Sequence, residues 1–203
     1  MIAIIDYDAG NTFNVQKALQ HIGLDAVLTA DRDTILAADG VILPGVGAYA
    51  SAISVLRERG LIEVIHEVVD RNIPLLGICL GMQLLFDESE EYGPTPGLGI
   101  IPGTVKAIPS NLGLRVPHMG WNQNTLCRKD SVFSDVADKY TYFVHSYYVD
   151  TDSQYVTTTA DYGIQVPGIV EMGNVYGMQF HPEKSGNVGL DLLRTFGNIL
   201  LKR

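Results

Sequence analysis

The sequence has little positive charge. Its 14 lysine and arginine residues stand against 23 aspartate and glutamate residues, which gives a formal net charge of -9. The basic residues are scattered, and only Arg128–Lys129 and Lys202–Arg203 are adjacent. A nucleic-acid-binding protein needs a concentrated basic face to neutralise phosphates, so we expect no nucleic-acid partner.

The sequence also has few cysteines and no segment typical of a membrane protein. Cys79 and Cys127 form no C-x-x-C motif, and we expect neither a disulfide nor a zinc site. The uncharged apolar stretch at residues 72–86 is too short to cross a bilayer. The N-terminal residues lack the basic start of a signal peptide, so a cytoplasmic protein without a membrane partner is expected.

Length and composition indicate one globular domain, residues 1–203, of which 46% are hydrophobic and 18% charged. Asn11 is expected to cap the first helix, and Asp31 or Asp33 a short helix that ends near Ala38. Short apolar strands are predicted at residues 2–7, 26–28, 40–43 and 74–78, with helices at 12–22, 48–57, 61–71 and 80–88. This alternation predicts an α/β fold with a mostly parallel central sheet and flanking helices.

The second half of the chain changes character and is rich in Gly, Pro, Val, Thr and Tyr. Strand-like segments occur at residues 104–108, 142–149, 155–159, 169–171 and 175–180. We interpret them as extra, partly antiparallel strands added to the same core. A closing helix is predicted at residues 189–202, with apolar side chains along one face.

The segment Gly77–Gly81 has the form G-x-C-x-G between a predicted strand and a predicted helix. This pattern is typical of a nucleophile elbow, in which glycines permit a tight turn that exposes the nucleophile, here Cys79. The following helix would favour the thiolate and would supply the Leu80 N–H as an oxyanion donor. The alternative is a buried structural cysteine. The glycine-rich loop Pro44–Gly47, at the end of another strand, favours the catalytic interpretation because parallel strands end at one edge.

His181 and Glu183 follow a predicted strand and are separated by Pro182. A nucleophilic cysteine needs a base, and the base needs an acceptor on its second ring nitrogen. We therefore predict a triad of Cys79, His181 and Glu183. The other histidines are weaker candidates: His21 and His66 are expected to be exposed or to cap helices, and His118 and His145 to be hydrogen-bonded within strands. No metal-ligand spacing is present.

Residues 77–83 together with 181–183 resemble the class I glutamine amidotransferases, and the resemblance spans essentially the whole chain. Residues 116–122, 142–147 and 177–185 resemble one branch, the glutaminase subunits of imidazole glycerol phosphate synthases. Two positions depart from that pattern without touching the triad. Asp8 stands where glycine is commoner, and Val166–Gly168 replaces a segment that is usually alanine-rich.

The resemblance implies glutamine as substrate and no cofactor. Gln83 and Glu91 would hold glutamine with the backbone of Gly45, Ser146 and Tyr147, and Val46 and Leu80 would supply oxyanion-hole amides. The ammonia would pass to a (β/α)8-barrel cyclase subunit in a heterodimer, which makes imidazole glycerol phosphate and aminoimidazole carboxamide ribotide in histidine biosynthesis.

The same resemblance predicts a partner interface around the active-site edge. The polar and aromatic residues that gather there are Asn11, Asn14, Trp121, Asn122, Tyr142 and Lys184. Taken singly, Trp121 would be interpreted as a core residue and Lys184 as a solvated charge. Their common placement favours an interface that covers the mouth of the site.

Two other functions stay open on the sequence alone. The first is a glutaminase that feeds a pyridoxal phosphate synthase, although that relative typically has P-G-G-E where this chain has Pro44–Gly47. The second is a catalytically silent domain that only binds and regulates a partner, which the complete triad argues against.

Overall fold

The computed structural model describes residues 1–8 and 11–201. Ala9, Gly10 and the last predicted helical residue, Lys202, lie outside the described residues. The helices are α1 (Thr12–His21), α2 (Arg32–Leu36), α3 (Tyr49–Glu58), α4 (Leu61–Asp70), α5 (Leu80–Leu84) and α6 (Gly186–Leu200), with short 3₁₀ turns η1 (Ser110–Leu112), η2 (Ser134–Val136), η3 (Ser153–Tyr155) and η4 (Pro182–Lys184).

An eight-stranded central sheet forms the middle of the molecule, in the order β2-β1-β3-β4-β14-β13-β12-β9. The first five strands of this order, from β2 to β14, are parallel to one another. The last three are added by antiparallel pairing: β13 pairs with β14, β12 with β13, and β9 with β12. These strands are β1 (Ile2–Ile5), β2 (Ala26–Thr29), β3 (Gly40–Leu43), β4 (Leu75–Ile78), β9 (Thr125–Leu126), β12 (Val156–Asp161), β13 (Gln165–Met172) and β14 (Val175–Met178). The α/β fold with a mostly parallel sheet is thus confirmed.

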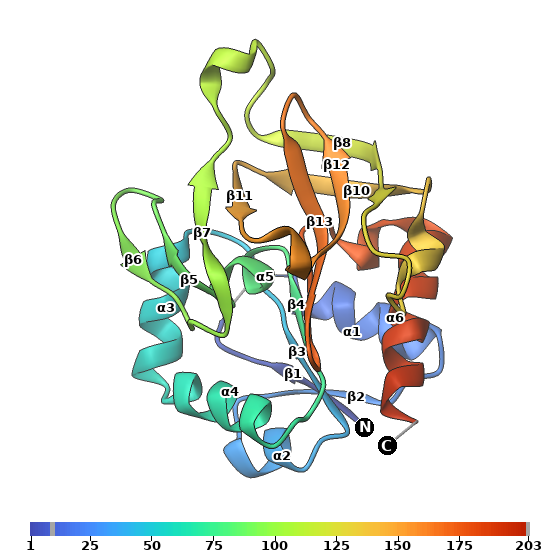
Figure 1. Cartoon of the computed structure of the whole chain (residues 1–203). Coiled ribbons are helices and arrows are strands. Elements are labelled where there is room, and N and C mark those ends of the chain that lie inside the picture. Colours follow the sequence, from blue (N-terminus) through green and yellow to red (C-terminus); the bar gives the residue numbers. More distant parts are fainter. Residues whose placement is uncertain (9–10, 202–203) are drawn as a thin grey trace.

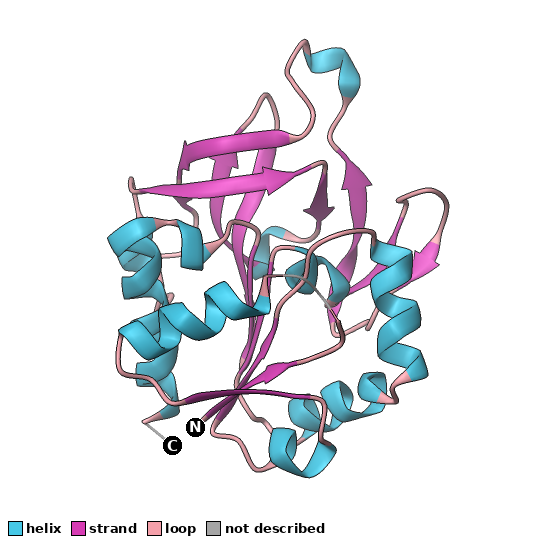
Figure 2. Cartoon of the chain, turned by 180° about the vertical axis from the view of Figure 1, so that it is seen from behind, coloured by secondary structure: helices cyan, strands magenta, loops and turns pink. Residues whose placement is uncertain are grey.

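Helices cover both faces of this sheet (Figures 1 and 2). Alternate residues of β1 point to opposite faces, so Ala3 and Ile5 pack with α2, α3 and α4, whereas Ile2 and Ile4 pack with α1 and α6. All four side chains are at most 2% exposed. Burying an apolar side chain of this size contributes about 1.5–3 kcal/mol, so a strand buried on both faces needs no polar residue.

The remaining strands form two small sheets. One pairs β8 (His118–Gln123) with β10 (Tyr140–His145), and these strands cross the upper part of Figure 1. The other has the order β11-β7-β5-β6, with β5 (Phe86–Ser89), β6 (Thr95–Pro96), β7 (Ile101–Ala107) and β11 (Tyr147–Asp150). The extra strands of the second half are thus divided between the central sheet and two small sheets.

Two segment predictions were wrong. The helix expected at residues 80–88 ends at Leu84, because Phe86 to Ser89 form β5 and pair with β7. The strand expected at residues 142–149 is interrupted at Ser146, where the chain passes from one small sheet to the other. Within the described residues, no helix is long and apolar enough to cross a membrane.

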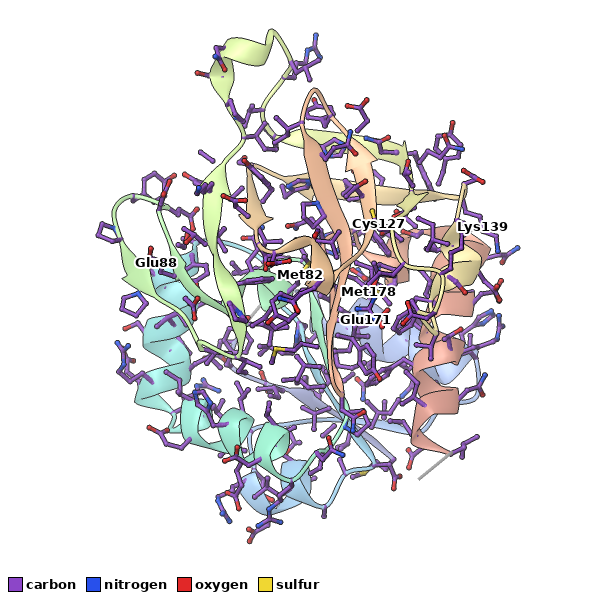
Figure 3. All side chains as sticks on the ribbon, in the orientation of Figure 1. Met82, Glu88, Cys127, Lys139, Glu171 and Met178 are labelled. Atoms are coloured by element: carbon purple, nitrogen blue, oxygen red, sulfur yellow. The ribbon has the colours of Figure 1, made fainter. Side chains whose placement is uncertain are left out.

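The two cysteines lie in different settings. Cys79 is buried and Cys127 is exposed, and both are free. Met82, in α5, and Met178, in β14, are labelled in Figure 3 and are fully buried. Reagents that require access alone would reach Cys127 first.

Candidate active site

Cys79 lies in a strained turn between β4 and α5. Its backbone has φ 55° and ψ −112°, a conformation that residues with a side chain rarely adopt. The turn is tight because Gly81 packs directly on the carbonyl of Leu43, so a Cβ there would clash with that oxygen. A Cβ on Gly77 would lie 2.7 Å from the Gly81 oxygen. Both glycines of the G-x-C-x-G pattern are therefore required by packing.

The helix that follows Cys79 is shorter than expected. α5 has five residues, whereas nine were predicted. Leu80, the first residue of α5, and Cys79 both line the cavity. An oxyanion donor at this position needs only the amide and not a long helix.

His181 and Glu183 form a buried pair at the end of the segment that follows β14. The His181 Nδ1 and Glu183 Oε1 atoms are 2.7 Å apart, and their side chains are 2% and 0% exposed. Because the carboxylate can only accept, Nδ1 carries the hydrogen, and Nε2 is the ring nitrogen available to Cys79. Burial lowers the pKa of His181, but interactions with Cys79 and Glu183 outweigh it and raise the pKa to about 9.

Tyr142 and Ser185 hold the turn that carries His181. The Tyr142 carbonyl accepts a hydrogen bond from the His181 N–H at 2.9 Å. The Ser185 hydroxyl accepts from the Tyr142 N–H at 3.0 Å and donates to the His181 carbonyl at 2.7 Å. The position of the imidazole therefore depends on β10, a strand 36 or more residues earlier in the chain.

Asn11 does not cap α1 as expected. Its φ is 73° and its side chain makes no capping hydrogen bond. Instead its amide donates to Glu183 Oε1, and the Asn14 amide donates to Asn11 Oδ1 at 2.6 Å. The second carboxylate oxygen of Glu183 is buried and has no hydrogen-bond partner among the described residues. Asn11 thus fixes the carboxylate oxygen that faces His181.

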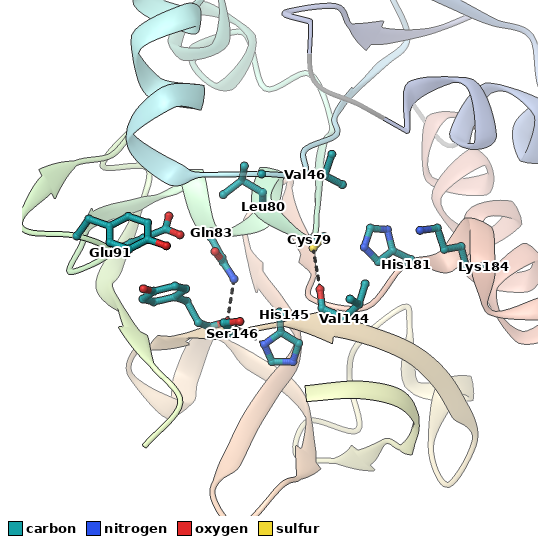
Figure 4. A pocket seen from close by; sticks show the side chains of 13 residues that line it. Val46, Cys79, Leu80, Gln83, Glu91, Val144, His145, Ser146, His181 and Lys184 are labelled. Carbon is teal, nitrogen blue, oxygen red and sulfur yellow. Dashed lines mark hydrogen bonds between the residues drawn. The ribbon is translucent and has the colours of Figure 1, made fainter. Parts of the chain in front are cut away.

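A cavity of about 440 Å³ opens beside Cys79 (Figure 4). Figure 4 shows Cys79 between His181 on one side and Gln83 on the other. The predicted residues that line it are Val46, Cys79, Leu80, Gln83, Glu91, Ser146, Tyr147, His181 and Lys184. Gly45 is buried and is not one of the lining residues, and a Cβ on it would be 2.6 Å from the Tyr7 hydroxyl. Gly47, from the loop Pro44–Gly47 expected at this edge, also lines the cavity, whereas sequence patterns missed Tyr92, Val144 and His145.

Gln83 and Glu91 are held in fixed orientations. The Gln83 amide nitrogen donates to the Tyr147 carbonyl at 2.9 Å and to Gln179 Oε1 at 3.0 Å. Both of its N–H groups are then used, which leaves the Gln83 oxygen as an acceptor for a ligand. Glu91 accepts a hydrogen bond at 2.6 Å from the backbone N–H of Tyr49, the first residue of α3.

The aromatic residues predicted for an interface lie on the β8–β10 pair. Trp121 is opposite Tyr142 in the strand register, their rings meet edge to face at 6.1 Å, and Trp121 is 55% exposed. Trp121 is therefore not a core residue. Trp121 and Asn122 both lie within β8. Lys184 is exposed and lines the cavity.

The remaining histidines lie as expected. His21 and His66 are exposed. His118 and His145 are buried and hydrogen-bonded to each other at 2.9 Å. Among residues 1–8 and 11–201, no group of three or more histidine, cysteine, aspartate or glutamate side chains is arranged to hold a metal ion.

Comparison with known proteins places the chain in a family. The sequence model described as "Glutamine amidotransferase class-I" matches residues 3–198. The chain belongs to this family. The family predicted from the motifs around Cys79 and His181 is thereby confirmed.

Curated members of the glutamine amidotransferases are similar to the chain over nearly its whole length. A relative from Lactiplantibacillus plantarum is 53% identical over 97% of this chain and 94% of its own length. One from Lacticaseibacillus casei is 55% identical over the same shares, and one from Listeria monocytogenes is 48% identical over 98% and 96%. Each bears the name imidazole glycerol phosphate synthase subunit HisH.

Solved structures share the amidotransferase fold at lower identity. A structure described as a glutamine amidotransferase has a TM-score of 0.77 and 19% identity, and covers 98% of this chain and 99% of its own. A putative GMP synthase subunit from Thermoplasma acidophilum has a TM-score of 0.71 and 18% identity, with 99% and 94% covered. These similarities confirm the fold and do not identify a partner protein.

Proposed function

We propose that residues 1–203 act as one amidotransferase domain, the glutaminase subunit of an imidazole glycerol phosphate synthase, and hydrolyse glutamine with Cys79 as nucleophile. The observation that carries the proposal is the cavity itself. It brings a cysteine at a strained elbow, a histidine paired with a buried carboxylate and an amide acceptor into one space of about 440 Å³. The similarity to HisH subunits at about 50% identity supports the choice of synthase.

The reaction begins when the Cys79 thiolate attacks the side-chain carboxamide of glutamine. The backbone amides of Val46 and Leu80 stabilise the oxyanion, each contributing roughly 3–4 kcal/mol as in comparable sites. His181 gives its proton to the leaving ammonia. The departure of ammonia leaves a thioester between Cys79 and the substrate acyl group. It then takes a proton from water, which attacks the thioester and releases glutamate. Glu183 stabilises the charged imidazole throughout.

Substrate binding follows from the orientation of the cavity walls. The Gln83 oxygen accepts from an N–H of glutamine, and the Glu91 carboxylate attracts its α-ammonium group. The backbone at Gly45, Ser146 and Tyr147 completes the contacts. The hydrogen bond from Tyr49 to Glu91 supports this role, because it holds the carboxylate at the cavity wall.

The ammonia passes to a separate (β/α)8-barrel cyclase subunit in a heterodimer. Protonated ammonia is no longer a nucleophile, so a docked partner that excludes water preserves it. The interface comprises Asn11, Asn14, Trp121, Asn122, Tyr142 and Lys184. Trp121 is exposed on the β8–β10 pair, which supports this surface, since aromatic residues are frequent energetic centres of interfaces.

The proposal places the protein in the cytoplasm, where both free cysteines stay reduced. It favours an imidazole glycerol phosphate synthase over a pyridoxal phosphate synthase, because the curated relatives at about 50% identity bear the former name.

The test is glutamate release by the chain, in the presence or absence of the cyclase partner with its nucleotide ligand. We expect the wild type and Cys127→Ala to release glutamate faster with the partner, and Cys79→Ala to release none. Release by Cys79→Ala at the wild-type rate would overturn the nucleophile. A wild type that releases none with the partner bound would support a silent regulatory domain instead. Equal wild-type rates with and without the partner would overturn coupling and leave the triad standing.

A further inference from the structure

The wall of the cavity opposite the elbow is a bend in the chain. β10 ends at His145 and pairs with β8, whereas β11 begins at Tyr147 and pairs with β7. Ser146 lies at the corner between the two sheets, and its carbonyl accepts from the Ile108 N–H at 2.9 Å. The His145 side chain crosses this corner, because its Nδ1 lies 2.8 Å from the Tyr147 carbonyl oxygen.

The hydrogen bonds along this wall can run in one direction only. A carbonyl accepts, so His145 Nδ1 must carry a hydrogen, and in a neutral ring Nε2 is then an acceptor. His145 Nε2 lies 2.9 Å from His118 Nδ1, which must therefore donate. His118 Nε2 is in turn an acceptor, and the Asn122 amide donates to it at 3.3 Å. Both rings are thus fixed as the Nδ1–H tautomer.

The same chain of hydrogen bonds extends to the residues beside Cys79. The Tyr147 carbonyl accepts from both His145 and Gln83, which uses its two lone pairs. Gln83 also donates to Gln179 Oε1, and the Gln179 amide lies 3.9 Å from the Cys79 sulfur. A connected path of polar groups therefore joins Asn122, on the strand that carries Trp121, to the cavity floor.

The two rings are held rigidly and stay neutral. His118 stacks between Tyr162 at 3.9 Å and Phe143 at 4.9 Å. Burial lowers the pKa of His118 to about 4 and that of His145 to about 3. Neither ring is therefore suited to proton transfer at neutral pH, and both are suited to fixing the position of other groups.

We propose that His145 and His118 are positioning residues for glutamine binding, which hold the bend at Ser146 and turn the Tyr147 carbonyl toward Gln83, so that the Gln83 oxygen faces the substrate. The Tyr147 carbonyl fixes the direction of these hydrogen bonds at one end, and the Asn122 amide supports it at the other. This inference rests on the proposed glutaminase function. It assigns to the two histidines an effect on substrate affinity and none on the reactivity of Cys79.

The first test reads the tautomers in the wild-type protein by ¹⁵N-histidine NMR, with His118→Phe used for assignment because phenylalanine keeps the stacking. We expect His118 and His145 both as neutral Nδ1–H tautomers. Asn122→Asp replaces the donor by an acceptor, so His118 should lose that tautomer or become charged. An Nε2–H tautomer at either histidine of the wild type, or unchanged tautomers in Asn122→Asp, would overturn the proposal.

The second test separates substrate affinity from chemistry with two variants of one residue. His145→Asn keeps a donor near the Nδ1 position, whereas His145→Leu removes it. We expect His145→Leu to raise KM for glutamine about 3- to 10-fold, the range for one lost neutral hydrogen bond, and His145→Asn to restore most of it. Iodoacetamide, which needs no substrate pocket, should label Cys79 at the wild-type rate in both.

The outcomes distinguish this inference from the proposed function. A wild type without glutaminase activity in complex with its partner means that the proposed function has failed. An active wild type with an unchanged KM in folded His145→Leu, or an equal rise in KM for His145→Asn, means that only the positioning role has failed. A fall in kcat and in the iodoacetamide rate together would point to a general loss of structure and would also overturn it.

Discussion

Replacing Glu183 with glutamine should lower the pKa of His181 by about one unit. The carboxylate accepts from His181 Nδ1 at 2.7 Å, and both side chains are almost fully buried, so solvent screens the pair little. A hydrogen bond to a charged group contributes about 1.5–3 kcal/mol, against about 0.5–1.5 kcal/mol between neutral groups. The difference, about 1–1.5 kcal/mol, disfavours the imidazolium and moves its pKa from about 9 to roughly 8.

The assay is an NMR titration of His181 together with kcat for glutamate release, which should fall about 10-fold for the same loss of free energy. Glu171→Gln is the matched control, because Glu171 is also a buried carboxylate and accepts from Ser131 and Thr157 away from the cavity. That variant should leave the pKa of His181 unchanged. An unchanged pKa in Glu183→Gln, or an equal fall in Glu171→Gln, would refute the reasoning.

Three further changes test other parts of the site. His181→Asn should lower kcat about 10²- to 10⁴-fold through lost proton transfer, with the melting temperature retained; a larger loss in folded His118→Asn would show that the base is wrong. Gly81→Ala should lower the free energy of unfolding by about 1–3 kcal/mol, since its Cβ clashes with Leu43; an unchanged denaturation midpoint would contradict the packing. Trp121→Ala with Lys184→Ala should weaken binding of the cyclase subunit by at least about 2 kcal/mol in calorimetry, and an unchanged Kd would refute the interface.

The sequence pattern predicted the turn at Cys79 because the residues that this turn requires are its immediate neighbours in the chain. The glycines on either side of Cys79 are needed by close backbone contacts within a single strand–turn–helix unit. The pairing of His181 with Glu183 was predictable for the same reason, since two residues of one turn provide both the imidazole and its acceptor. The central sheet followed from continuous apolar strands, whose burial on both faces leaves a clear pattern.

The errors came from contacts between distant segments. The predicted helix was continued through residues 86–88, but Phe86 pairs with Ile101 and forms a strand. Asn11 is a good helix cap by type, yet its amide bonds to Glu183, 172 residues away. His145 was missed as a cavity residue because the interruption of the strand at Ser146, which turns it toward the site, follows from pairing with two different sheets.

The central claim is that Cys79 is the nucleophile that attacks glutamine. Its most direct test is mass spectrometry of the chain after treatment with an electrophilic glutamine analogue, with the modified peptide identified. The account predicts one adduct, on Cys79, even though Cys127 is the more exposed thiol, and no adduct in Cys79→Ala. Modification of Cys127 in preference to Cys79, or an adduct on the Cys79→Ala chain at the wild-type rate, would contradict it.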